Sequence, residues 1–317
     1  MKKVFVLLFL VLLSIPQIIR ADSSTKIRVT ALSGTVGLAM LRIMSEPAPQ
    51  DSPYRFEVLK TPDLAVGKLI AGEADIAGLP TNTAAVMYNK GVDIRVAAII
   101  GWGVMYIVSN DPLIKKWSDL KGKEIYVPGK GAISDILLRY LMSKNNLNPD
   151  LDVKIMYMAS AVEAAQLVAS GKVTLAALPE PWVTEVLENN SKLKVVLDYQ
   201  KEWKRVEKQG LFYPQTCIVV RKEFAREHPE ALRQFLNELE KSIKWVKHNP
   251  KAGGLLAEKY IQISAKAVEK GLGRTNLRYR AAFKVQAEIV RFLQRLVEFV
   301  PESVGGKLPD EGFYAKP

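Results

Sequence analysis

The sequence of 317 residues predicts an α/β protein in which two lobes, connected by two hinge crossovers, enclose a ligand cleft. Three observations support this fold class. Apolar strands and helices alternate over the first two thirds of the chain, two sets of residues recur at a nearly constant offset, and the last third is mainly helical. Because alternating strands and helices build parallel sheets covered by helices, each repeated unit should form its own lobe.

The expected elements follow the chain in order. For the first unit we expect strands over residues 27–32, 56–59, 74–79 and 94–100, and helices that begin at Val36, Asp63 and Thr81. For the second unit we expect strands over residues 124–127, 153–157, 173–178 and 195–197, and helices that begin at Ser134, Val162 and Trp182. A strand over residues 216–220 then precedes amphipathic helices over residues 229–247, 254–261 and 278–300. These last helices have no sheet of their own, so they should pack on the first unit.

The internal repeat is the most informative feature of the sequence. Residues 68–80 (KLIAGEADIAGLP) match residues 167–179 (LVASGKVTLAALP) at a constant offset of 99. In each segment a helix should end at a glycine, Gly72 or Gly171, and an apolar strand should end at Leu-Pro. A second match, at an offset of 97, pairs two sets of residues: Gly34, Leu41 and Arg42 with Gly131, Leu138 and Arg139. The matches indicate two similar units, although the alternative, that any chain of strands, glycines and helices would look alike, stays open.

The repeat also sets the expected lobe boundaries. The helical last third should return to the first unit, so the chain must cross between units near residues 106–109 and near residues 215–220. Lobe 1 then comprises residues 22–108 and 218–317, and lobe 2 comprises residues 109–217. Two crossings form a hinge with a cleft between the lobes. In open parallel sheets, ligands bind where the carboxyl ends of strands meet the starts of helices.

The composition excludes several classes of function. The formal net charge is +12, but Lys and Arg are interspersed with acidic residues, so we expect no nucleic-acid partner. The single cysteine, Cys217, lies in an apolar stretch, where a buried inert thiol is expected. Two histidines, His228 and His248, leave little material for imidazole catalysis or metal binding. We therefore expect no metal, no cofactor and no enzymatic activity.

The first 21 residues are expected to be a secretory signal peptide. Lys2 and Lys3 precede an apolar run over residues 4–13, and a small residue, Ala21, offers a cleavage point. This run is too short to span a bilayer as a helix, and no later stretch contains eighteen consecutive apolar residues. No cysteine lies near the cleavage point to carry a lipid anchor. The expected location is therefore the periplasm, with an uncleaved anchor as the alternative.

Five short segments carry a resemblance to a known family: residues 79–83 (LPTNT), 118–123 (SDLKGK), 128–131 (PGKG), 178–182 (LPEPW) and 305–309 (GGKLP). They resemble the nitrate/sulfonate/taurine-type solute-binding proteins of ABC transporters, a group that includes binders of thiamine precursors. The resemblance implies a type II periplasmic-binding-protein fold, with the membrane permease and the ATPase as separate chains. Relatives in this group bind sulfonates, nitrate, pyrimidine precursors of thiamine, or flavin, so the resemblance does not identify the solute.

Candidate site residues follow from the expected turns at the cleft. One pair of turns offers hydroxyls and backbone N–H groups, which suit an anionic or carbonyl oxygen: Ser33, Gly34 and Thr35 in the first unit, and Gly131, Ala132 and Ser134 in the second. The alternative for each is a plain turn with a serine cap. Neither has the glycine spacing of an ATP or dinucleotide loop. None of the proposed turns carries an arginine, the residue best suited to a small dianion.

The turns one strand further on carry the other polar candidates. Asn82 and Thr83 either cap a helix, which the sequence favours, or point into the cleft. In the second unit, Glu180 could bind an amine or ring N–H, or could simply complement the helix dipole. Trp182 follows it and offers a ring to the ligand.

Further aromatic residues suggest a planar ligand. Trp102 stands between glycines, one of them Gly103, directly after an expected strand, and Tyr213 stands at the second crossing. With Trp182 across the cleft, these rings could enclose a flat solute, which favours an aromatic or heteroaromatic compound over a bare oxyanion. The alternative is that these rings only fill the core.

The sequence thus predicts an extracytoplasmic solute-binding protein of an ABC importer. It should capture a sulfonate, a nitrate-like anion or a heteroaromatic vitamin precursor by closure of two lobes, and deliver it to a permease and its ATPase subunit. We expect it to act as a monomer. Two alternatives remain: an enzyme of the thiamine-pyrimidine or menaquinone synthesis type on the same fold, which would need a His or Cys in the cleft, and a periplasmic sensor subunit.

Overall fold

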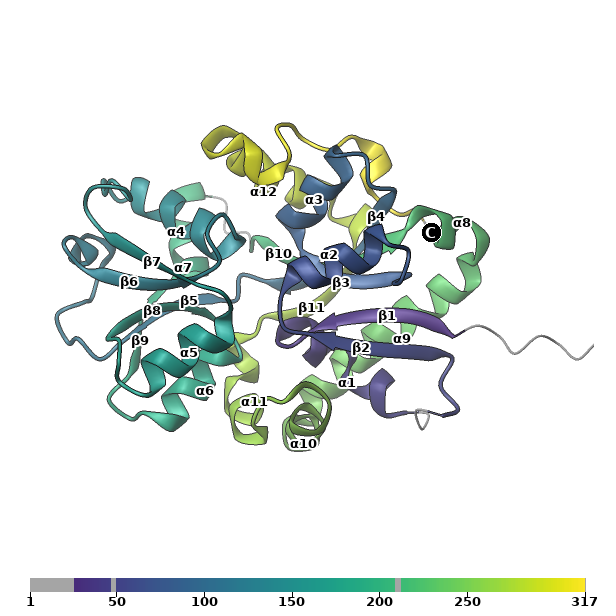
Figure 1. The fold of residues 1–317 in the computed structure, drawn as a ribbon, viewed down its shortest axis with the longest axis horizontal. Coiled ribbons are helices and arrows are strands. Elements are labelled where there is room, and N and C mark those ends of the chain that lie inside the picture. Colours follow the sequence, from purple (N-terminus) through teal and green to yellow (C-terminus); the bar gives the residue numbers. More distant parts are fainter. Residues whose placement is uncertain (1–25, 47–49, 209–211, 317) are drawn as a thin grey trace, which may run out of the picture.

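The computed structural model describes residues 26–46, 50–208 and 212–316. The chain forms two α/β lobes that lie side by side (Figure 1). The expected signal peptide, residues 1–21, lies outside the described residues. Within them, no helix combines the length and the apolar content that a membrane span requires.

Lobe 1 is built on a six-stranded sheet with the strand order β11-β4-β10-β3-β1-β2. Its strands are β1 (Ile27–Leu32), β2 (Tyr54–Leu59), β3 (Ile76–Pro80), β4 (Ile94–Trp102), β10 (Pro214–Arg221) and β11 (Leu277–Ala281). Its helices are α1 (Thr35–Ser45), α2 (Pro62–Ile70), α3 (Thr81–Asn89), α8 (Lys222–Glu227), α9 (Pro229–His248), α10 (Pro250–Ile261), α11 (Ala265–Gly271) and α12 (Gln286–Phe299).

Lobe 2 is built on a five-stranded sheet with the strand order β7-β6-β8-β5-β9. Its strands are β5 (Met105–Ser109), β6 (Glu124–Pro128), β7 (Lys154–Met158), β8 (Leu175–Pro179) and β9 (Lys194–Asp198). Its helices are α4 (Ile133–Ser143), α5 (Ala161–Ala169), α6 (Trp182–Asn189) and α7 (Tyr199–Glu207). Short 3₁₀ turns are η1 (Trp117–Leu120) here and η2 (Leu272–Arg274), η3 (Ala282–Lys284), η4 (Pro301–Val304) and η5 (Glu311–Phe313) in lobe 1.

The two sheets share one topology. In lobe 1, β2, β1 and β3 run parallel and β10 is antiparallel to its neighbours β3 and β4. In lobe 2, β7, β6 and β8 run parallel and β5 is antiparallel to its neighbours β8 and β9. The repeated sequence segments end in β3 and β8, whose bounds differ by the predicted offset of 99. The predicted fold class, two α/β lobes of the type II arrangement, is confirmed.

The chain crosses between the lobes twice, directly before β5 and directly before β10. The chain leaves lobe 1 between β4 and β5, where Gly103 has a φ of 64°, and returns between α7 and β10. Residues 105–108 therefore belong to the lobe 2 sheet and residues 214–217 to the lobe 1 sheet. This corrects the expected boundaries after residues 108 and 217, which fall inside strands because pairing with the new sheet begins directly after each crossing.

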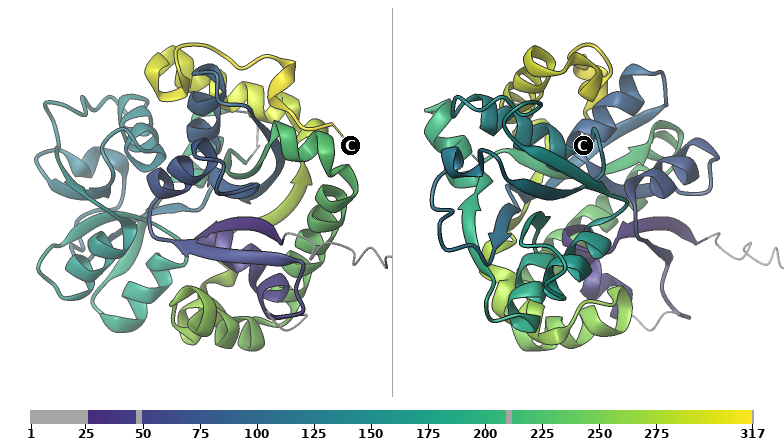
Figure 2. Two further views of the ribbon diagram at one scale, coloured as in Figure 1. Left: turned by 45° about the vertical axis from the view of Figure 1, so that its right-hand side comes forward. Right: turned by 60° about the vertical axis from the view of Figure 1, so that its left-hand side comes forward.

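The last third of the chain also departs from the expectation in one place. The expected helix over residues 278–300 is divided into β11 and α12. Polar and apolar residues alternate in β11, where Arg278 and Arg280 are exposed and Leu277 is buried. This period of two is that of a half-buried strand, and β11 adds to the lobe 1 sheet as an edge strand beside β4. Figure 2 shows α12 and the C-terminal segment lying along lobe 1.

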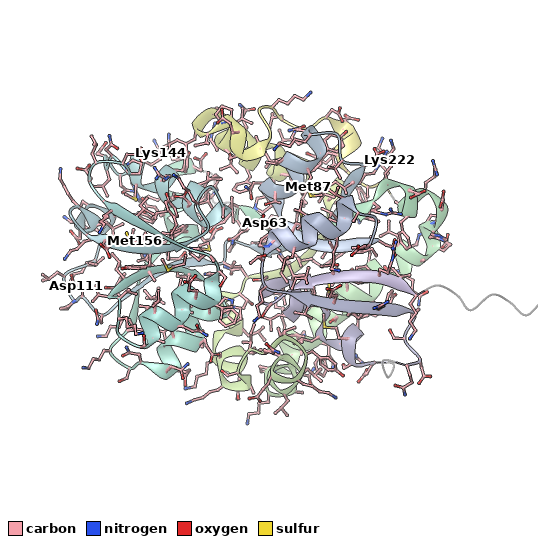
Figure 3. All side chains as sticks on the ribbon, in the orientation of Figure 1. Asp63, Met87, Asp111, Lys144, Met156 and Lys222 are labelled. Carbon is pink, nitrogen blue, oxygen red and sulfur yellow. The ribbon has the colours of Figure 1, made fainter. Side chains whose placement is uncertain are left out.

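The buried apolar residues form two clusters, and each cluster includes residues of both lobes. Strand β10 is buried along almost its whole length, as is β4, as expected for strands covered on both faces by helices. Charged side chains such as Lys144 and Lys222 lie at the surface (Figure 3). Helix α11 packs between α10 of lobe 1 and α6 of lobe 2, so the helical last third also contacts the second lobe.

Candidate ligand-binding cleft

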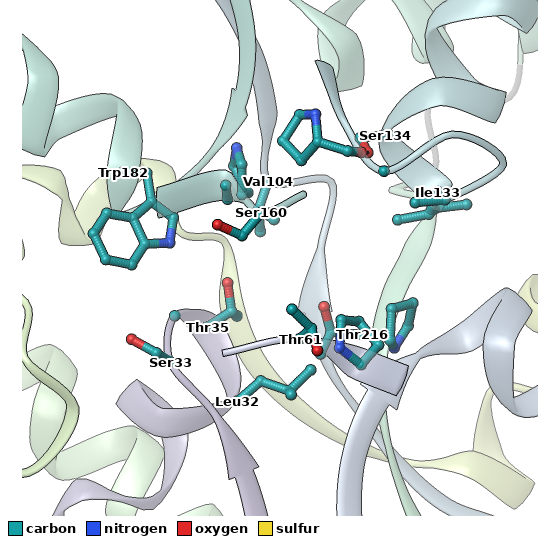
Figure 4. Close-up of a pocket in the computed structure, with 18 of the residues that line it drawn as sticks. Leu32, Ser33, Thr35, Thr61, Val104, Ile133, Ser134, Ser160, Trp182 and Thr216 are labelled. Atoms are coloured by element: carbon teal, nitrogen blue, oxygen red, sulfur yellow. The ribbon is translucent and has the colours of Figure 1, made fainter. Parts of the chain in front are cut away.

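A cavity of about 190 Å³ lies between the two lobes. The turns that follow the parallel strands of both sheets form its walls, and hinge residues close its base. Polar or glycine lining residues are Ser33, Gly34, Thr35, Lys60, Thr61, Gly129, Ser134, Ser160, Glu180, Gln215 and Thr216. Figure 4 shows Ser134, Ser160 and Trp182 of lobe 2 on one side and Ser33, Thr35 and Thr61 of lobe 1 on the other.

Helix starts converge on this cavity from both lobes. Helices α1, α2, α4, α5 and α6 all begin within one residue of a lining residue. The first backbone N–H groups of a helix have no partner inside the helix. Four of the five residues that precede these helices, Gly34, Thr61, Ala132 and Pro181, provide no side-chain cap. Ser160 caps α5 by accepting a hydrogen bond from Glu163 N, and the Glu180 carboxylate accepts one from Thr184 N in the first turn of α6. The cavity is therefore surrounded by N–H donors and by the positive ends of helix dipoles.

The hydroxyl groups of the cavity differ in what they bind. Ser33 donates to Ile261 O at 2.8 Å, and Ser134 donates to Pro128 O at 2.5 Å. Both hydroxyl protons are used in hydrogen bonds to backbone carbonyls, so these hydroxyls help to hold the turns. The hydroxyls of Thr61 and Thr216 have no hydrogen bond to another residue in the part of the chain that the structure describes. These two groups are free to bind a ligand.

Two ionisable side chains line the cavity, and they differ sharply. Lys60 is exposed and has no ion pair with any residue in 26–46, 50–208 or 212–316. Glu180 is fully buried, and its carboxylate accepts a hydrogen bond from Arg274 Nε at 2.5 Å. Thr184 also donates to it, from its N–H and its hydroxyl. Burial raises the pKa of Glu180, whereas the hydrogen bond from Arg274 lowers it. The net charge offered to a ligand is therefore positive.

Trp182 places an indole at the edge of the cavity. The side chain is 8% exposed, and its Nε1 lies 3.9 Å from the point where a Cβ on Gly34 would sit. No residue that the structure describes accepts a hydrogen bond from this N–H. Since a buried indole N–H usually has a partner, this donor is available to a bound solute.

Several contacts join the lobes around the cavity. The hydroxyl of Thr35 in lobe 1 donates to Glu180 O in lobe 2 at 3.3 Å. Beside it, Arg274 Nη2 lies 2.5 Å from the Thr184 hydroxyl. Between α11 and α6, Ser264 donates to Glu185 at 2.7 Å and Lys270 pairs with Glu188 at 2.8 Å. The lobes are thus held together on the Glu180 side by direct polar contacts.

Residues 39–265 match the family model of the ABC transporter, phosphonate, periplasmic substrate-binding protein. The chain belongs to this family. It is the substrate-binding component of an ABC importer, which confirms the expected kinship with transporter solute-binding proteins. The family consists of transporter binding proteins, and it implies a small-molecule substrate and ABC transporter components as partners. No curated protein matches the sequence.

Solved structures agree with the family. The binding protein is similar to an ABC transporter from Parabacteroides distasonis, with 29% identity, a TM-score of 0.75, and coverage of 92% of this chain and 99% of that one. It is also similar to the periplasmic aliphatic sulphonate binding protein SsuA from Escherichia coli (16% identity, TM-score 0.72, 92% of both chains). The periplasmic nitrate-binding protein NrtA from Synechocystis PCC 6803 shares 13% identity, with a TM-score of 0.67 and coverage of 88% and 84%. The last two likenesses concern the fold alone.

About half of the residues predicted for the site line the cavity of the binding protein: Ser33, Gly34, Thr35, Ala132, Ser134, Glu180 and Trp182. Gly131 lies in the same loop but not in the wall; its N–H donates to Asp135. The carboxylate of Glu180 binds Arg274, and a contact of this carboxylate with an amine or ring N–H of the ligand stays a prediction.

The predicted residues of the β3–α3 turn lie elsewhere. Asn82 is buried, and its Nδ2 donates to Ser303 O at 3.2 Å, so it binds the C-terminal segment instead of capping α3. Neither Asn82 nor Thr83 lines the cavity. The C-terminal segment packs beside the start of α3, which explains why the side chains of Asn82 and Thr83 do not line the cavity.

The hinge aromatics do not enclose a flat ligand. Trp102 is 3% exposed, its Nε1 donates to Arg278 O at 2.9 Å, and the Arg278 guanidinium lies 4.9 Å from its ring centre. Gly103 O accepts from Asn276, and a Cβ on Gly103 would meet the Gln200 side chain at 2.2 Å. The glycine thus permits close packing at the hinge, not a ligand approach. This corrects the interpretation of Trp102 and Gly103.

Tyr213 is also a core residue. It is 1% exposed and stacks on Phe292, with ring centres 5.8 Å apart and an angle of 18° between the rings. Trp182 is therefore the one predicted ring that lines the cavity within the described residues. The core-packing alternative holds for the other two.

Sequence reasoning missed the turns after β2 and β7. Lys60 and Thr61 line the cavity in lobe 1, and Ser160 does so in lobe 2. A usable signal was present, because Thr61 precedes a proline at the first position of α2 and Ser160 precedes α5 directly. Gln215 and Thr216 were missed because no local pattern shows that the start of a returning strand reaches the cleft.

The two histidines and the cysteine do not line the cavity. His228 precedes α9 and contacts Phe224, and His248 binds Lys244 O at the end of the same helix. Cys217 is buried as expected, and burial raises its pKa to about 12. Among the residues that the structure describes, no group of three or more His, Cys, Asp or Glu side chains could hold a metal ion.

Proposed function

We propose that the binding protein captures a small organic solute with an oxygen-rich anionic head, by closure of the two lobes, and delivers it to a membrane permease that an ATPase subunit drives. Phosphonates, sulfonates and nitrate-like anions share this head chemistry. The observation that carries the proposal is the convergence of five helix starts on one cavity, three of which, those of α1, α2 and α4, have no capping side chain. Backbone N–H groups at helix starts bind such oxygens without an arginine.

Closure follows because the two lobes each supply part of the groups that would bind the solute. Lobe 1 supplies Thr61 and Lys60, and lobe 2 supplies the starts of α4, α5 and α6. A solute that binds both sets has a higher affinity for the closed form than for the open form, so it shifts the population toward closure. A micromolar Kd corresponds to about −8 kcal/mol, which is sufficient for this purpose.

The partners and the location follow from the transporter family. We infer that the protein works in the periplasm and acts as a monomer. We also infer that it is not an enzyme, because neither His nor Cys is among the cavity residues that the structure describes. A sensor subunit would share the same cleft; a permease and an ATPase encoded beside it would favour transport.

A heteroaromatic vitamin precursor is a second candidate solute. The observation in its favour is Trp182, whose ring borders the cavity and whose Nε1–H has no partner among the described residues. A cavity of 190 Å³ is large enough for a single ring, since an apolar cavity of about 150 Å³ holds benzene.

Thermal shift and calorimetry on the mature protein test the proposal. The probes are methylphosphonate, ethanesulfonate, nitrate and a pyrimidine. A ligand at about 100 times its Kd should add about 2.7 kcal/mol to the free energy of unfolding. We expect at least one of the anions to bind in this way. Binding of the pyrimidine with no effect of any anion would contradict the proposal and favour the second candidate.

A matched pair of lysine variants locates the anion. Lys60→Gln removes the unpaired charge at the cavity, and Lys251→Gln removes an exposed lysine on α10 that does not line it. We expect Lys60→Gln to weaken anion binding several-fold, and less so at high salt, since a charge in water is screened. Lys251→Gln should leave the Kd unchanged. Equal Kd values for the two variants would place the anion outside this cavity.

A further inference from the structure

The two lobes meet along two flanks, in addition to the two chain crossings. In the first, which we call the α11 flank, α11 and η2 of lobe 1 pack on α6 of lobe 2. In the second, the α12 flank, α12 of lobe 1 packs on α4 and α7 of lobe 2. Figure 1 shows α12 and α11 at opposite ends of the boundary between the lobes. Side chains therefore connect the lobes at both ends of this boundary.

In each flank a buried glutamate of lobe 2 binds an arginine of lobe 1. In the α11 flank, Arg274 Nε lies 2.5 Å from the fully buried carboxylate of Glu180. In the α12 flank, Arg295 Nε lies 2.8 Å from the carboxylate of Glu207, whose side chain is 7% exposed. Tyr140 of lobe 2 donates a hydrogen bond to the same carboxylate. Breaking a buried pair of this kind is costly, because it leaves a carboxylate without its cation.

Apolar contacts strengthen both flanks. In the α12 flank, the ring centre of Phe292 lies 5.7 Å from that of Trp203, and the ring centre of Phe299 lies 5.5 Å from that of Tyr140. In the α11 flank, Val268 of α11 belongs to the same buried cluster as the apolar residues of α6. Separation of either flank would return these surfaces to water. A motion that opens the cleft is therefore favoured when it leaves both flanks in contact.

Each flank also holds one of the two crossings. Beside η2, Asn276 Nδ2 donates to Gly103 O at 2.7 Å, and in the α12 flank Tyr213 stacks on Phe292. A rigid rotation of one lobe against the other keeps two separate contacts in place only when its axis passes through both. An axis through the two flanks runs beside both crossings, where a few backbone torsions can absorb the rotation.

We propose that the two ion pairs, Arg274 with Glu180 and Arg295 with Glu207, are the pivots about which the lobes rotate when the cleft opens and closes. The proposal rests on the two-lobe closure proposed above and adds its axis. Both pairs persist in the open and the closed form. Because a twist of the lobes against each other would separate the flanks, the pivots restrict the motion to a change in the width of the cleft.

Distances between pairs of spin labels, measured by pulsed electron paramagnetic resonance on the mature protein, test the pivots. The labelled positions are exposed, and the native Cys217 is buried, so it should stay unlabelled. One label pair spans the cleft and one spans each flank: Leu64→Cys with Lys130→Cys across the cleft, Glu269→Cys with Asn189→Cys across the α11 flank, and Val290→Cys with Lys201→Cys across the α12 flank.

The ligand-free protein decides whether the flanks stay closed. We expect a broad distance distribution across the cleft and narrow distributions across both flanks. A flank distribution as broad as that of the cleft would overturn the proposal, and so would a cleft distribution as narrow as those of the flanks. Saturating methylphosphonate or ethanesulfonate should narrow the cleft distribution alone. If calorimetry shows that neither compound binds, the proposed function loses its support, while the ligand-free comparison still tests the pivots.

Variants of the arginines separate the ion pairs from the packing around them. Arg295→Gln should broaden the distribution across the α12 flank and leave that of the α11 flank narrow, and Arg295→Lys, which keeps the charge, should restore a narrow one. Arg291→Gln is the matched control, because Arg291 lies on the same helix and has no ion pair with any described residue. Arg274→Gln makes the corresponding test on the α11 flank, in case Arg295→Gln does not fold. Narrow flank distributions in the folded glutamine variants would overturn the proposal.

Discussion

The turn after β3 in lobe 1 and the turn after β8 in lobe 2 occupy the same place in two sheets of one topology, yet they do different things. At the offset of 99 residues, Thr83 corresponds to Trp182 and Thr81 to Glu180. In lobe 2, Trp182 reaches the cavity and Glu180 binds Arg274. In lobe 1, Pro80 alone of this turn lines the cavity.

The difference comes from what covers each turn. The C-terminal segment packs on α3, where Asn82 binds Ser303 O, Asn89 binds Val304 O at 2.7 Å, and Gly305 fits closely against Asn89. The start of α6 is instead covered by α11, and Gly271 lies so close to Thr184 that a Cβ there would meet its hydroxyl at 2.4 Å. A repeat determines where strands and helices lie, but later segments of the chain determine which turns a ligand can reach.

The largest expected effect concerns Trp102, at the end of β4. The equivalent strand in lobe 2 is β9, and within the described residues that sheet has no counterpart of β11, the strand that covers Trp102. Trp102→Ala should therefore cost about 3–5 kcal/mol of folding free energy and lower the melting temperature of the ligand-free protein. Affinity in the folded fraction should change little. Urea denaturation measures the stability of this variant, and calorimetry measures its affinity for the solute. A stable variant with weakened binding would show that Trp102 contacts the solute.

The next effect concerns Arg274, which makes the turn after β8 different from that after β3. Arg274→Gln leaves the fully buried carboxylate of Glu180 without its cationic partner, and because Arg274 is 38% exposed we expect a loss of about 2 kcal/mol at neutral pH. The folded-state pKa of Glu180 is raised by burial, so its favourable contribution is complete below its ordinary pKa and is lost as the pH rises. Removal of Arg274 raises this pKa further. The stability gap between variant and wild type should thus widen from pH 4.5 to 7.5.

A control for this variant lies in the same interface. Lys270→Gln breaks the exposed pair with Glu188, also between α11 and α6, and should change stability little at either pH, because exposed ion pairs contribute little. Urea denaturation of both variants at the two pH values provides the measurement. If the difference in unfolding free energy between Arg274→Gln and wild type were the same at both pH values, Arg274 would not be what stabilises the ionised carboxylate of Glu180.

The sequence predicted the topology better than the site, for physical reasons that particular residues make clear. The strands that end at Pro80 and Pro179 were predicted correctly because a glycine that ends a helix, an apolar run and a proline that ends a strand all act locally on the backbone. The positions of Ser33 and Ser134 in the cleft follow from the same rule, since turns after parallel strands share one edge. Trp102 was misplaced because its partner, Arg278 O, is distant in sequence and lies in a strand predicted as helix.

The smallest effects separate the two equivalent turns most directly. Asn82→Ala removes a hydrogen bond to the C-terminal segment, which should cost about 1 kcal/mol of stability and leave the Kd for the solute unchanged. Trp182→Phe keeps an aromatic ring but removes the Nε1–H at the cavity and part of the indole, so it should weaken solute binding about fivefold, the equivalent of about 1 kcal/mol, with a modest loss of stability. Melting temperature and Kd, measured on both variants, give a two-by-two result. Weaker solute binding in Asn82→Ala would mean that the lobe 1 turn reaches the solute. Unchanged solute binding in Trp182→Phe would mean that the lobe 2 turn does not reach it. Either result would contradict the idea that the C-terminal segment distinguishes the two turns.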